Sequence, residues 1–285
     1  MPRSRVILLS VLAGVTLLVV LGFAGVAAVQ FGQFLGGALL SQQGETAPNR
    51  DAPATEEDRD FGIVDIYDVD EQGALVPAAT GTAADVWNLF TRIVGDDVAG
   101  ASILQYKTGD APESDTLAYV YQDSDPQYWT LVVNLDTAND PQLLIATLVH
   151  EYAHVFSYAP EQFEPKGGSC PTFTVVEGCA EEASYLWQFY EEFWTGYSEH
   201  PDLENTDGDV AWEFYQRHEE DFVSDYAATN IGEDFAESFM TFVLEESWST
   251  ETVAGRKLDF FTNYPELVEL REHVRDELAV ELGLR

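Results

Sequence analysis

The sequence predicts an α+β fold, a mainly helical domain with a small β-sheet, preceded by one N-terminal transmembrane helix. Three observations support this prediction. An uncharged apolar run occupies the N-terminus, two β-rich runs form a hairpin pattern near the middle, and segments with helical periodicity dominate the remainder. The chain has 285 residues. About two hundred of them remain for the domain, enough for one hydrophobic core.

The N-terminal segment predicts export from the cytoplasm. Arg3 and Arg5 precede the apolar run Val6–Val29. This run is long enough for the roughly 20 helical residues that a bilayer core requires. Positive charge before such a run predicts that residues 1–5 are cytoplasmic and that the domain is held outside the cell membrane. The small residues that end the run leave open a cleaved signal peptide and secretion.

A polar segment separates the apolar run from the domain. Residues 30–60 are rich in Gln, Gly, Pro, Thr and acidic side chains, most of all from position 41 onward. We interpret them as a flexible linker. The predicted domain therefore covers residues 61–285.

The charge of the chain excludes several partners. The sequence holds 51 acidic and 13 basic residues, a formal charge of −38. Nucleic acids and anionic lipid headgroups require a basic surface instead. The acidic residues are spread over the whole domain, so a disordered acidic tail does not account for them. We interpret the acidity as a solubility feature, and leave open adaptation to salt or an acidic cleft that attracts cationic substrates.

The first part of the domain combines strands with one helix. Apolar and acidic positions alternate over residues 61–77, as in a strand, and apolar side chains at helical spacing predict a helix over residues 82–94. Two β-rich runs, Thr116–Gln122 and Tyr128–Asn134, flank the turn residues 123–126. Together they predict a hairpin.

The second part of the domain is predicted to be helical. Asp140 supplies an N-cap and Pro141 a first helical residue for a long apolar helix that reaches His154. Helical patterns also cover residues 180–194, 210–222, 233–248 and 265–282.

The two cysteines, Cys170 and Cys179, predict a disulfide. In an exported protein, a pair this close in sequence most simply closes a short loop. Metal ligation by the pair is the weaker alternative, because no second cysteine pair and no CxxC spacing accompany it.

A His-Glu-x-x-His motif lies at the end of the long apolar helix, at His150, Glu151 and His154. Residues four apart share a helix face, so both imidazoles can bind one Zn²⁺ ion, the single cofactor that the sequence predicts. Glu151 points to the flank, where it can take a proton from a metal-activated water that attacks a carbonyl. The alternative, two histidines satisfied in a core helix, leaves the Glu151 carboxylate buried and unpaired, which is unfavourable.

A catalytic zinc needs a third protein ligand, and two glutamates compete for this role. Glu233 lies at a predicted helix start behind the N-cap Asn230, and Glu237 follows one turn later on the same face. One carboxylate can bind zinc while the other orients a ligand histidine. Glu177, followed by Gly178, is the alternative third ligand. The simpler interpretation of Glu233 and Glu237 is that they are solvated acids at a helix start, where the helix dipole favours negative charge.

These motifs resemble a known family. His150-Glu151-x-x-His154, with Tyr226-x-x-Thr229-Asn230-x-x-Glu233-x-Phe235-Ala236-Glu237-x-Phe239, is similar to the catalytic domain of anthrax toxin lethal factor and related bacterial gluzincins. The resemblance covers residues 140–247. It implies a zincin-like metallopeptidase domain in which Glu233 is the third zinc ligand, Glu151 the general base and Tyr226 a donor to the oxyanion. It also implies that Glu237 supports a ligand histidine.

Two features depart from that family. The separation between His154 and Glu233 is longer than the family requires. Glu177-Gly178-x-Ala180 is similar to the third-ligand motif of aminopeptidase-type gluzincins. The third ligand is therefore the contested member of the predicted site.

The sequence thus predicts an exported, membrane-tethered zinc metallopeptidase that hydrolyses a peptide or protein substrate. We expect the substrate to lie along the edge strand of the hairpin, taken as Tyr128–Asn134. The alternatives are a catalytically inactive zincin-fold module that binds a partner at the cell surface and a zinc ion with a structural role only.

Overall fold

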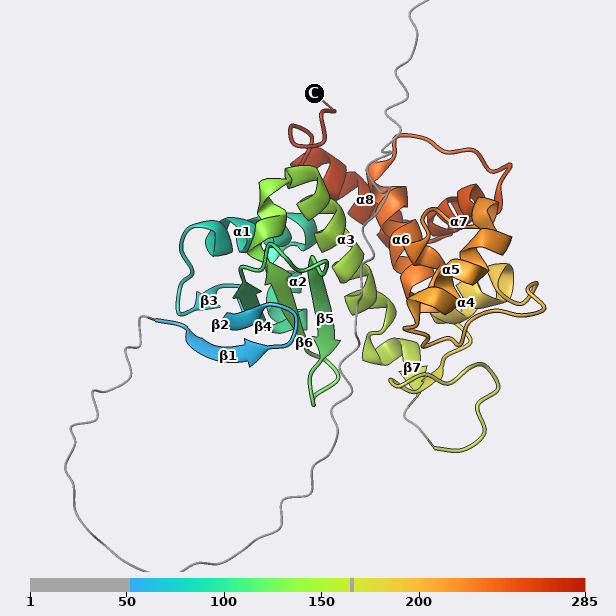
Figure 1. Cartoon of the computed structure of the whole chain (residues 1–285), viewed down its shortest axis with the longest axis horizontal. Coiled ribbons are helices and arrows are strands. Elements are labelled where there is room, and N and C mark those ends of the chain that lie inside the picture. The colour runs from blue at the N-terminus through green and yellow to red at the C-terminus, as the bar shows by residue number, and fades with distance from the viewer. Residues whose placement is uncertain (1–51, 165–166, 285) are drawn as a thin grey trace, which may run out of the picture.

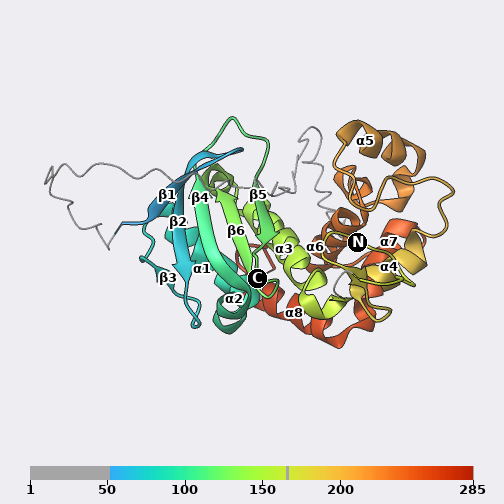
Figure 2. The same ribbon diagram turned by 90° about the horizontal axis from the view of Figure 1, so that it is seen from below.

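A β-sheet and a group of helices lie side by side in the folded chain, with helices α3 and α6 between them (Figures 1 and 2). The computed structural model describes residues 52–164 and 167–284. This arrangement confirms the mixed α+β fold with a small sheet. The predicted transmembrane segment and most of the predicted linker lie outside the described residues. Within the described ranges, no helix is both long enough and apolar enough to cross a membrane.

The main sheet has six strands, and its path runs β1-β2-β4-β6-β5, with β3 paired to β2. The β4–β6 pair is parallel and every other pair is antiparallel. The strands are β1 (Ala54–Asp58), β2 (Gly62–Val69), β3 (Leu75–Val76), β4 (Ile103–Gly109), β5 (Ala118–Gln122) and β6 (Trp129–Asn134). A separate pair joins β7 (Phe163–Glu164) to β8 (Cys179–Ala180).

Two expectations about the sheet are wrong. Residues 54–58, assigned to the linker, form β1 and pair with β2, so the folded part begins before residue 61. The hairpin is confirmed, but its second strand, β6, is not an edge, because it lies between β4 and β5. The edge strand of the hairpin is β5, whose only strand partner in the described part of the chain is β6.

Eight α-helices are present in the described residues. They are α1 (Thr82–Val94), α2 (Asp96–Ser102), α3 (Pro141–Ser157), α4 (Tyr185–Phe193), α5 (Gly208–Arg217), α6 (Ile231–Leu244), α7 (Val253–Phe260) and α8 (Pro265–Glu277). The helix predicted over residues 82–94 has these bounds in the structure. Helix α4 begins later than predicted because Ser184 caps it, its hydroxyl accepting the Trp187 N–H. Helices α2 and α7 were not predicted.

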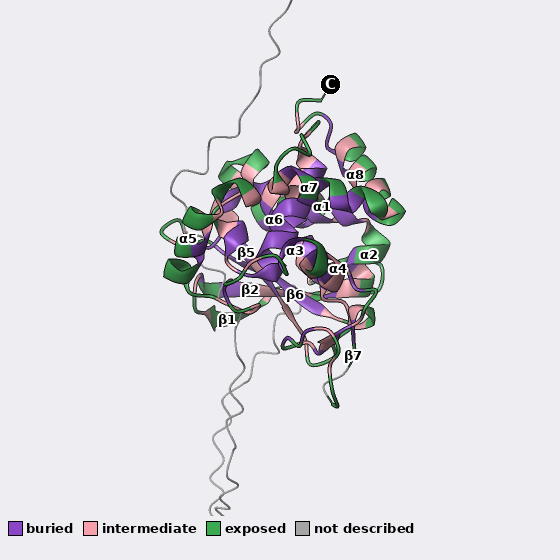
Figure 3. Cartoon of the chain, turned by 90° about the vertical axis from the view of Figure 1, so that its right-hand side faces the viewer, coloured by how far each residue is buried: buried purple, intermediate pink, exposed green. Residues whose placement is uncertain are grey.

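Helix α3 forms where the sequence places it. The Asp140 carboxylate accepts the backbone N–H groups of Gln142 and Leu143, each at 3.1 Å, and Pro141 occupies the first helical position. The helix is buried on several sides because the sheet covers one face and α6 packs against another. Buried residues accordingly concentrate in α3 and α6 at the centre of the molecule (Figure 3).

Aromatic side chains fix how α3 and α6 meet. The Phe156 ring of α3 packs edge-on against Phe235 and Phe239 of α6, with centroids 5.9 Å and 5.0 Å away. Edge-to-face packing of this kind adds about 0.5–1.5 kcal/mol per pair beyond the apolar area buried. These ring contacts between the buried faces of α3 and α6 therefore help to fix how the two helices lie against each other.

A buried ion pair anchors α6 from its other side. Lys257 of α7 places its Nζ atom 2.6 Å from Oδ2 of Asp234, and neither side chain is exposed at all. The Trp194 indole N–H donates to the same oxygen at 2.8 Å. Burial lowers the pKa of Lys257 and raises that of Asp234, and the mutual attraction only partly offsets both effects.

Replacing Lys257 with methionine is expected to lower the free energy of unfolding by at least about 3 kcal/mol, because the Asp234 carboxylate then stays buried without its cation. Urea denaturation of the full-length chain measures the change. The double variant Lys257→Met/Asp234→Asn is the matched control and should recover much of the loss. Equal stability of the single variant and the wild type would contradict the assignment of this ion pair.

Candidate metal centre

Three potential ligand atoms converge between the end of α3 and the start of α6. The Nε2 atoms of His150 and His154 are 3.1 Å apart. Oε2 of Glu233 lies 3.1 Å from the first and 3.3 Å from the second. Among the described residues, these three form the one group whose ligand atoms could hold a metal ion, all within 4.8 Å of one another.

Local structure explains how Glu233 reaches the two histidines. Asn230 caps α6, and its Oδ1 atom accepts the backbone N–H of Glu233 at 2.9 Å. Glu233 is therefore the third residue of the helix, where the helix dipole favours a carboxylate. Since α6 packs along α3, the first turn of α6 lies beside the last turns of α3.

The three atoms fit a tetrahedral metal. Ligands at about 2.0–2.1 Å from a tetrahedral zinc lie about 3.3 Å from each other, close to the separations seen here. Their side chains are sheltered from solvent, with exposures of 4% for His150, 12% for His154 and 5% for Glu233. Two imidazole nitrogens and a carboxylate oxygen are a donor set that zinc commonly takes.

Glu237 contacts His150 from the side away from the other candidate ligands. His150 Nδ1 lies 2.8 Å from Oε1 of Glu237. An ionised carboxylate can only accept a hydrogen bond, so Nδ1 donates to Glu237, and with a metal bound Nε2 would be the ligand atom. The second oxygen of Glu237 accepts the Ser224 hydroxyl at 2.6 Å. Glu237 thus lies where the sequence predicted it, behind a histidine of the centre.

The charges of the centre are strongly coupled. Burial lowers the pKa of His150, but the hydrogen bonds and charges of Glu233 and Glu237 outweigh it and hold this pKa well above its ordinary value. Burial raises the pKa of Glu233, but the charge of His154 and hydrogen bonds from both histidines bring it well below its usual range. A carboxylate that stays ionised among imidazoles suits a cation.

Glu151 lies beside the three atoms. Its carboxylate is buried, and Oε1 has no hydrogen-bond partner among the described residues. Burial raises the pKa of Glu151, although the charges of the two histidines and a hydrogen bond from the backbone N–H of Val120 oppose the shift. A buried oxygen without a partner is unfavourable in a structure unless a ligand satisfies it.

Tyr226 lies next to the centre, in the short helix η4 (Tyr226–Ala228). Its ring centroid is 6.0 Å from that of His150. Burial raises the pKa of its hydroxyl well above the ordinary value, and the charges of Glu233, Glu151 and Glu237 add to the shift. The hydroxyl therefore stays protonated and can act as a donor at this centre.

A pocket opens next to the metal centre. It is lined by Glu151, His154 and Glu233 of the centre and by Val120, Trp129, Tyr158, Val176, Glu177, Leu203, Glu204, Asn230 and Gly232. Glu177 is part of this wall and does not belong to the group of three converging ligand atoms. The disulfide between Cys170 and Cys179 is confirmed, and Cys179 lies two residues beyond Glu177.

Several pocket residues escaped the sequence analysis. Tyr158 lies one turn beyond His154, so its position could have been read from the helical spacing. It fits against α6 because Gly232 has no side chain there, and a Cβ atom at that position would overlap the Tyr158 hydroxyl. Leu203 and Glu204 lie in a loop with no recognisable motif, so their position at the pocket could not be predicted from the sequence.

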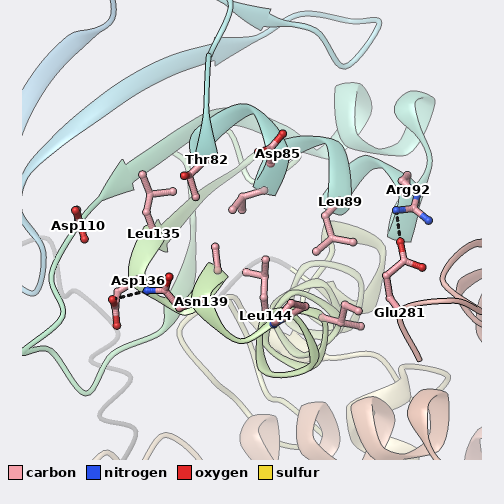
Figure 4. Close-up of a pocket in the computed structure, with 14 residues that line it drawn as sticks. Thr82, Asp85, Leu89, Arg92, Asp110, Leu135, Asp136, Asn139, Leu144 and Glu281 are labelled. Carbon is pink, nitrogen blue, oxygen red and sulfur yellow. Dashed lines mark hydrogen bonds and ion pairs between the residues drawn. The ribbon is translucent and has the colours of Figure 1, made fainter. Parts of the chain in front are cut away.

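A larger cavity of about 550 Å³ lies elsewhere, along α1 and the start of α3, and shares no lining residue with the pocket at the metal centre (Figure 4). Asp110 and Asp136 lie toward one end of it, and the ion pair between Arg92 and Glu281, 2.8 Å long, lies at the other. None of the predicted site residues lines this cavity.

Searches against models of protein families, curated protein sequences and solved structures found no match to this chain. Its function is therefore inferred from the geometry of the centre.

Proposed function

We propose that this chain is a zinc-dependent metallopeptidase of the gluzincin type, with a zincin-like domain. One observation carries the proposal: His150, His154 and Glu233 direct three ligand atoms to one point, and beside them lies the Glu151 carboxylate, whose Oε1 atom has no hydrogen-bond partner among the described residues. Such a set combines a metal-binding group with a free base in one buried place. If the two histidines were only hydrogen-bonded core residues, nothing would compensate for the buried oxygen of Glu151 that has no partner beside them.

A bound zinc ion would act as a Lewis acid, polarising the scissile carbonyl and lowering the pKa of a water to near neutrality. Glu151 is the group that accepts the proton of the attacking water and returns it to the leaving amine. The Tyr226 hydroxyl donates to the oxyanion that develops on the carbonyl. Glu237 keeps the His150 ring in the orientation that this chemistry needs.

The substrate peptide is proposed to bind along β5. Among the described residues this strand pairs with β6 on one side only, and Val120, at its centre, lines the pocket together with Glu151. An extended peptide can add to such an edge through backbone hydrogen bonds. We therefore propose β5 as the peptide-binding strand, in place of the predicted strand Tyr128–Asn134, which corresponds to β6.

The domain is proposed to work outside the cytoplasm, tethered to the cell membrane by Val6–Val29 or secreted after cleavage of that segment. The disulfide between Cys170 and Cys179 supports an oxidising compartment. The apolar run and its preceding arginines support export.

The full-length chain should hydrolyse peptide bonds in a random peptide library, lose this activity when zinc is chelated and regain it when zinc is restored. Mass spectrometry of the products identifies hydrolysis and its position. Zinc-loaded chain that cleaves no peptide, yet binds a protein tightly, would overturn the proposal in favour of a cell-surface binding module.

A further inference from the structure

We propose that the Tyr158 hydroxyl binds the substrate peptide by donating a hydrogen bond to a main-chain carbonyl in the pocket beside the metal centre. This inference rests on the proposed function and adds to it a substrate-binding residue that the His-Glu-x-x-His motif and the gluzincin resemblance leave unassigned. The centre then has two tyrosine hydroxyls with different tasks, Tyr226 at the oxyanion and Tyr158 at a neighbouring carbonyl.

The two tyrosines lie beside different histidines of the centre. The Tyr158 ring centroid is 6.2 Å from that of His154, and the Tyr226 ring centroid is 6.0 Å from that of His150. Tyr158 lines the pocket, whereas Tyr226 is not among the described residues that line it. Tyr158 is therefore the tyrosine that a ligand in the pocket contacts.

The hydroxyl of Tyr158 has no hydrogen-bond partner among the described residues. The hydrogen bonds of this residue are made by its backbone: its N–H donates to the His154 carbonyl at 3.0 Å, and its carbonyl accepts the Gln122 side-chain N–H at 3.4 Å. A phenol has an ordinary pKa of about 10, so the hydroxyl is a donor at neutral pH. Tyrosine hydroxyls that are withdrawn from solvent usually have a partner, and a ligand in the pocket can supply the one missing here.

The rest of the pocket wall offers mostly acceptors. Four of its side chains are carboxylates, and an ionised carboxylate can only accept hydrogen bonds. The Asn230 side chain is already used, since its Oδ1 atom accepts the Glu233 N–H at 2.9 Å and its Nδ2 atom donates to the Asn205 carbonyl at 2.9 Å. A peptide carbonyl in this pocket requires a donor, and the Tyr158 hydroxyl provides one.

The Tyr158 side chain is held at a fixed position. Its ring stacks on that of Phe163, with centroids 5.7 Å apart and an interplanar angle of 6°. Its hydroxyl lies against Gly232, where a Cβ atom would overlap it. Gly232 is the residue before Glu233, so the hydroxyl lies close to the helix turn that carries the proposed third ligand. A donor that is already fixed in place loses little conformational freedom when a peptide binds.

Tyr158 is also tied to β5, the strand on which the peptide is proposed to lie. Gln122, the last residue of β5, donates its side-chain N–H groups to the carbonyls of Tyr158 and Pro126. Val120 of the same strand lines the pocket together with Tyr158. When a peptide pairs with a strand edge, its carbonyls point alternately toward the strand and away from it. The carbonyls that point away need a donor outside β5, and this is the role proposed for Tyr158.

The competing explanation is that Tyr158 serves packing alone, through its ring. A matched pair of variants separates the two. Tyr158→Phe removes the hydroxyl and keeps the ring. Tyr215→Phe makes the same change at another partly buried tyrosine, whose ring stacks on Trp212 with centroids 5.8 Å apart and which is not among the described residues that line the pocket. An effect of losing any tyrosine hydroxyl appears equally in both.

The test uses peptides selected from a random library by binding to the zinc-loaded Glu151→Gln variant of the full-length chain. Calorimetry measures their binding to this variant with and without Tyr158→Phe, so that the result does not require turnover, and kcat/KM is measured in the Glu151 background. Tyr158→Phe should weaken binding and lower kcat/KM by about 3- to 10-fold, and zinc content should stay unchanged. Tyr215→Phe should match the wild type in all three measurements.

Peptides of different sequence should show the same loss, because every peptide carries the main-chain carbonyl. A loss confined to peptides with one kind of side chain would overturn the main-chain assignment. Equal binding and equal kcat/KM in Tyr158→Phe and the wild type, or loss of zinc in Tyr158→Phe, would overturn the inference, while cleavage by the wild type would leave the proposed function intact. Peptide binding that depends on the Tyr158 hydroxyl, in a zinc-loaded wild type that cleaves nothing, would overturn the proposed function alone.

Discussion

Glu151→Gln is expected to slow peptide hydrolysis by about 10²–10⁴-fold while zinc stays bound. Glutamine keeps the shape of the side chain but cannot accept the proton of the attacking water. The proposed metal ligands are His150, His154 and Glu233, and the substitution changes none of them. The amide also replaces a carboxylate that is buried with one oxygen unpaired, so the fold should tolerate the substitution.

The measurement is kcat/KM on a peptide found in the library, with zinc content determined on the same sample. Glu182→Gln, the same chemical change at an exposed position, is the control and should react at the wild-type rate. If Glu151→Gln holds one zinc and still cleaves as fast as the wild type, another residue is the base and the mechanism is wrong.

Glu233→Ala is expected to abolish stable zinc binding, whereas Glu177→Ala keeps it. Glu233 contributes one of the three converging ligand atoms, and its loss leaves only the two imidazole nitrogens of His150 and His154 in that group. Glu177 lines the pocket but lies outside this group. Glu237→Gln should fall between the two, weakening zinc binding by about 10- to 100-fold, because it only orients His150.

Titration of zinc against a competing chelator, with the full-length chain and each variant, gives the order of affinities. Circular dichroism on the same samples establishes that each variant is folded. Loss of zinc in Glu177→Ala, with zinc retained in Glu233→Ala, would assign the third ligand to the other glutamate.

The elements that the sequence predicts well are those specified by neighbouring residues. The cap at Asp140 and the proline after it locate α3, and the spacing of apolar residues locates α1. The His-Glu-x-x-His motif is local too, since residues four apart share a helix face. Two cysteines close in sequence, with export predicted from the N-terminal segment, were enough to predict the disulfide.

The elements that were missed or misplaced depend on distant partners. Whether a strand is central or an edge depends on pairing, and β6 becomes central only because β4, across a long connection, joins it in parallel. The strand β1 is polar and exposed, so its sequence resembles a linker until β2 pairs with it. Periodicity within a segment cannot reveal either partner.

The same division holds within the candidate centre. The two histidines and Glu151 are readable from five consecutive residues, but the choice between Glu233 and Glu177 rested on a resemblance and on helix-start signals. In the folded chain both glutamates lie at one pocket. Glu233 belongs to the ligand group, and Glu177 is part of the pocket wall. Only the packing of α6 on α3 separates these roles.

The origin of the ligands in two distant segments also bears on folding. His150 and His154 are one helical turn apart and can meet in any chain that forms α3, but Glu233 lies 83 residues from His150 and joins them only after α6 has docked. An unfolded chain must close that long loop before it can offer all three atoms. A metal that binds the native state in this selective way stabilises it by mass action, so metal occupancy would report how much of the protein has completed its tertiary structure.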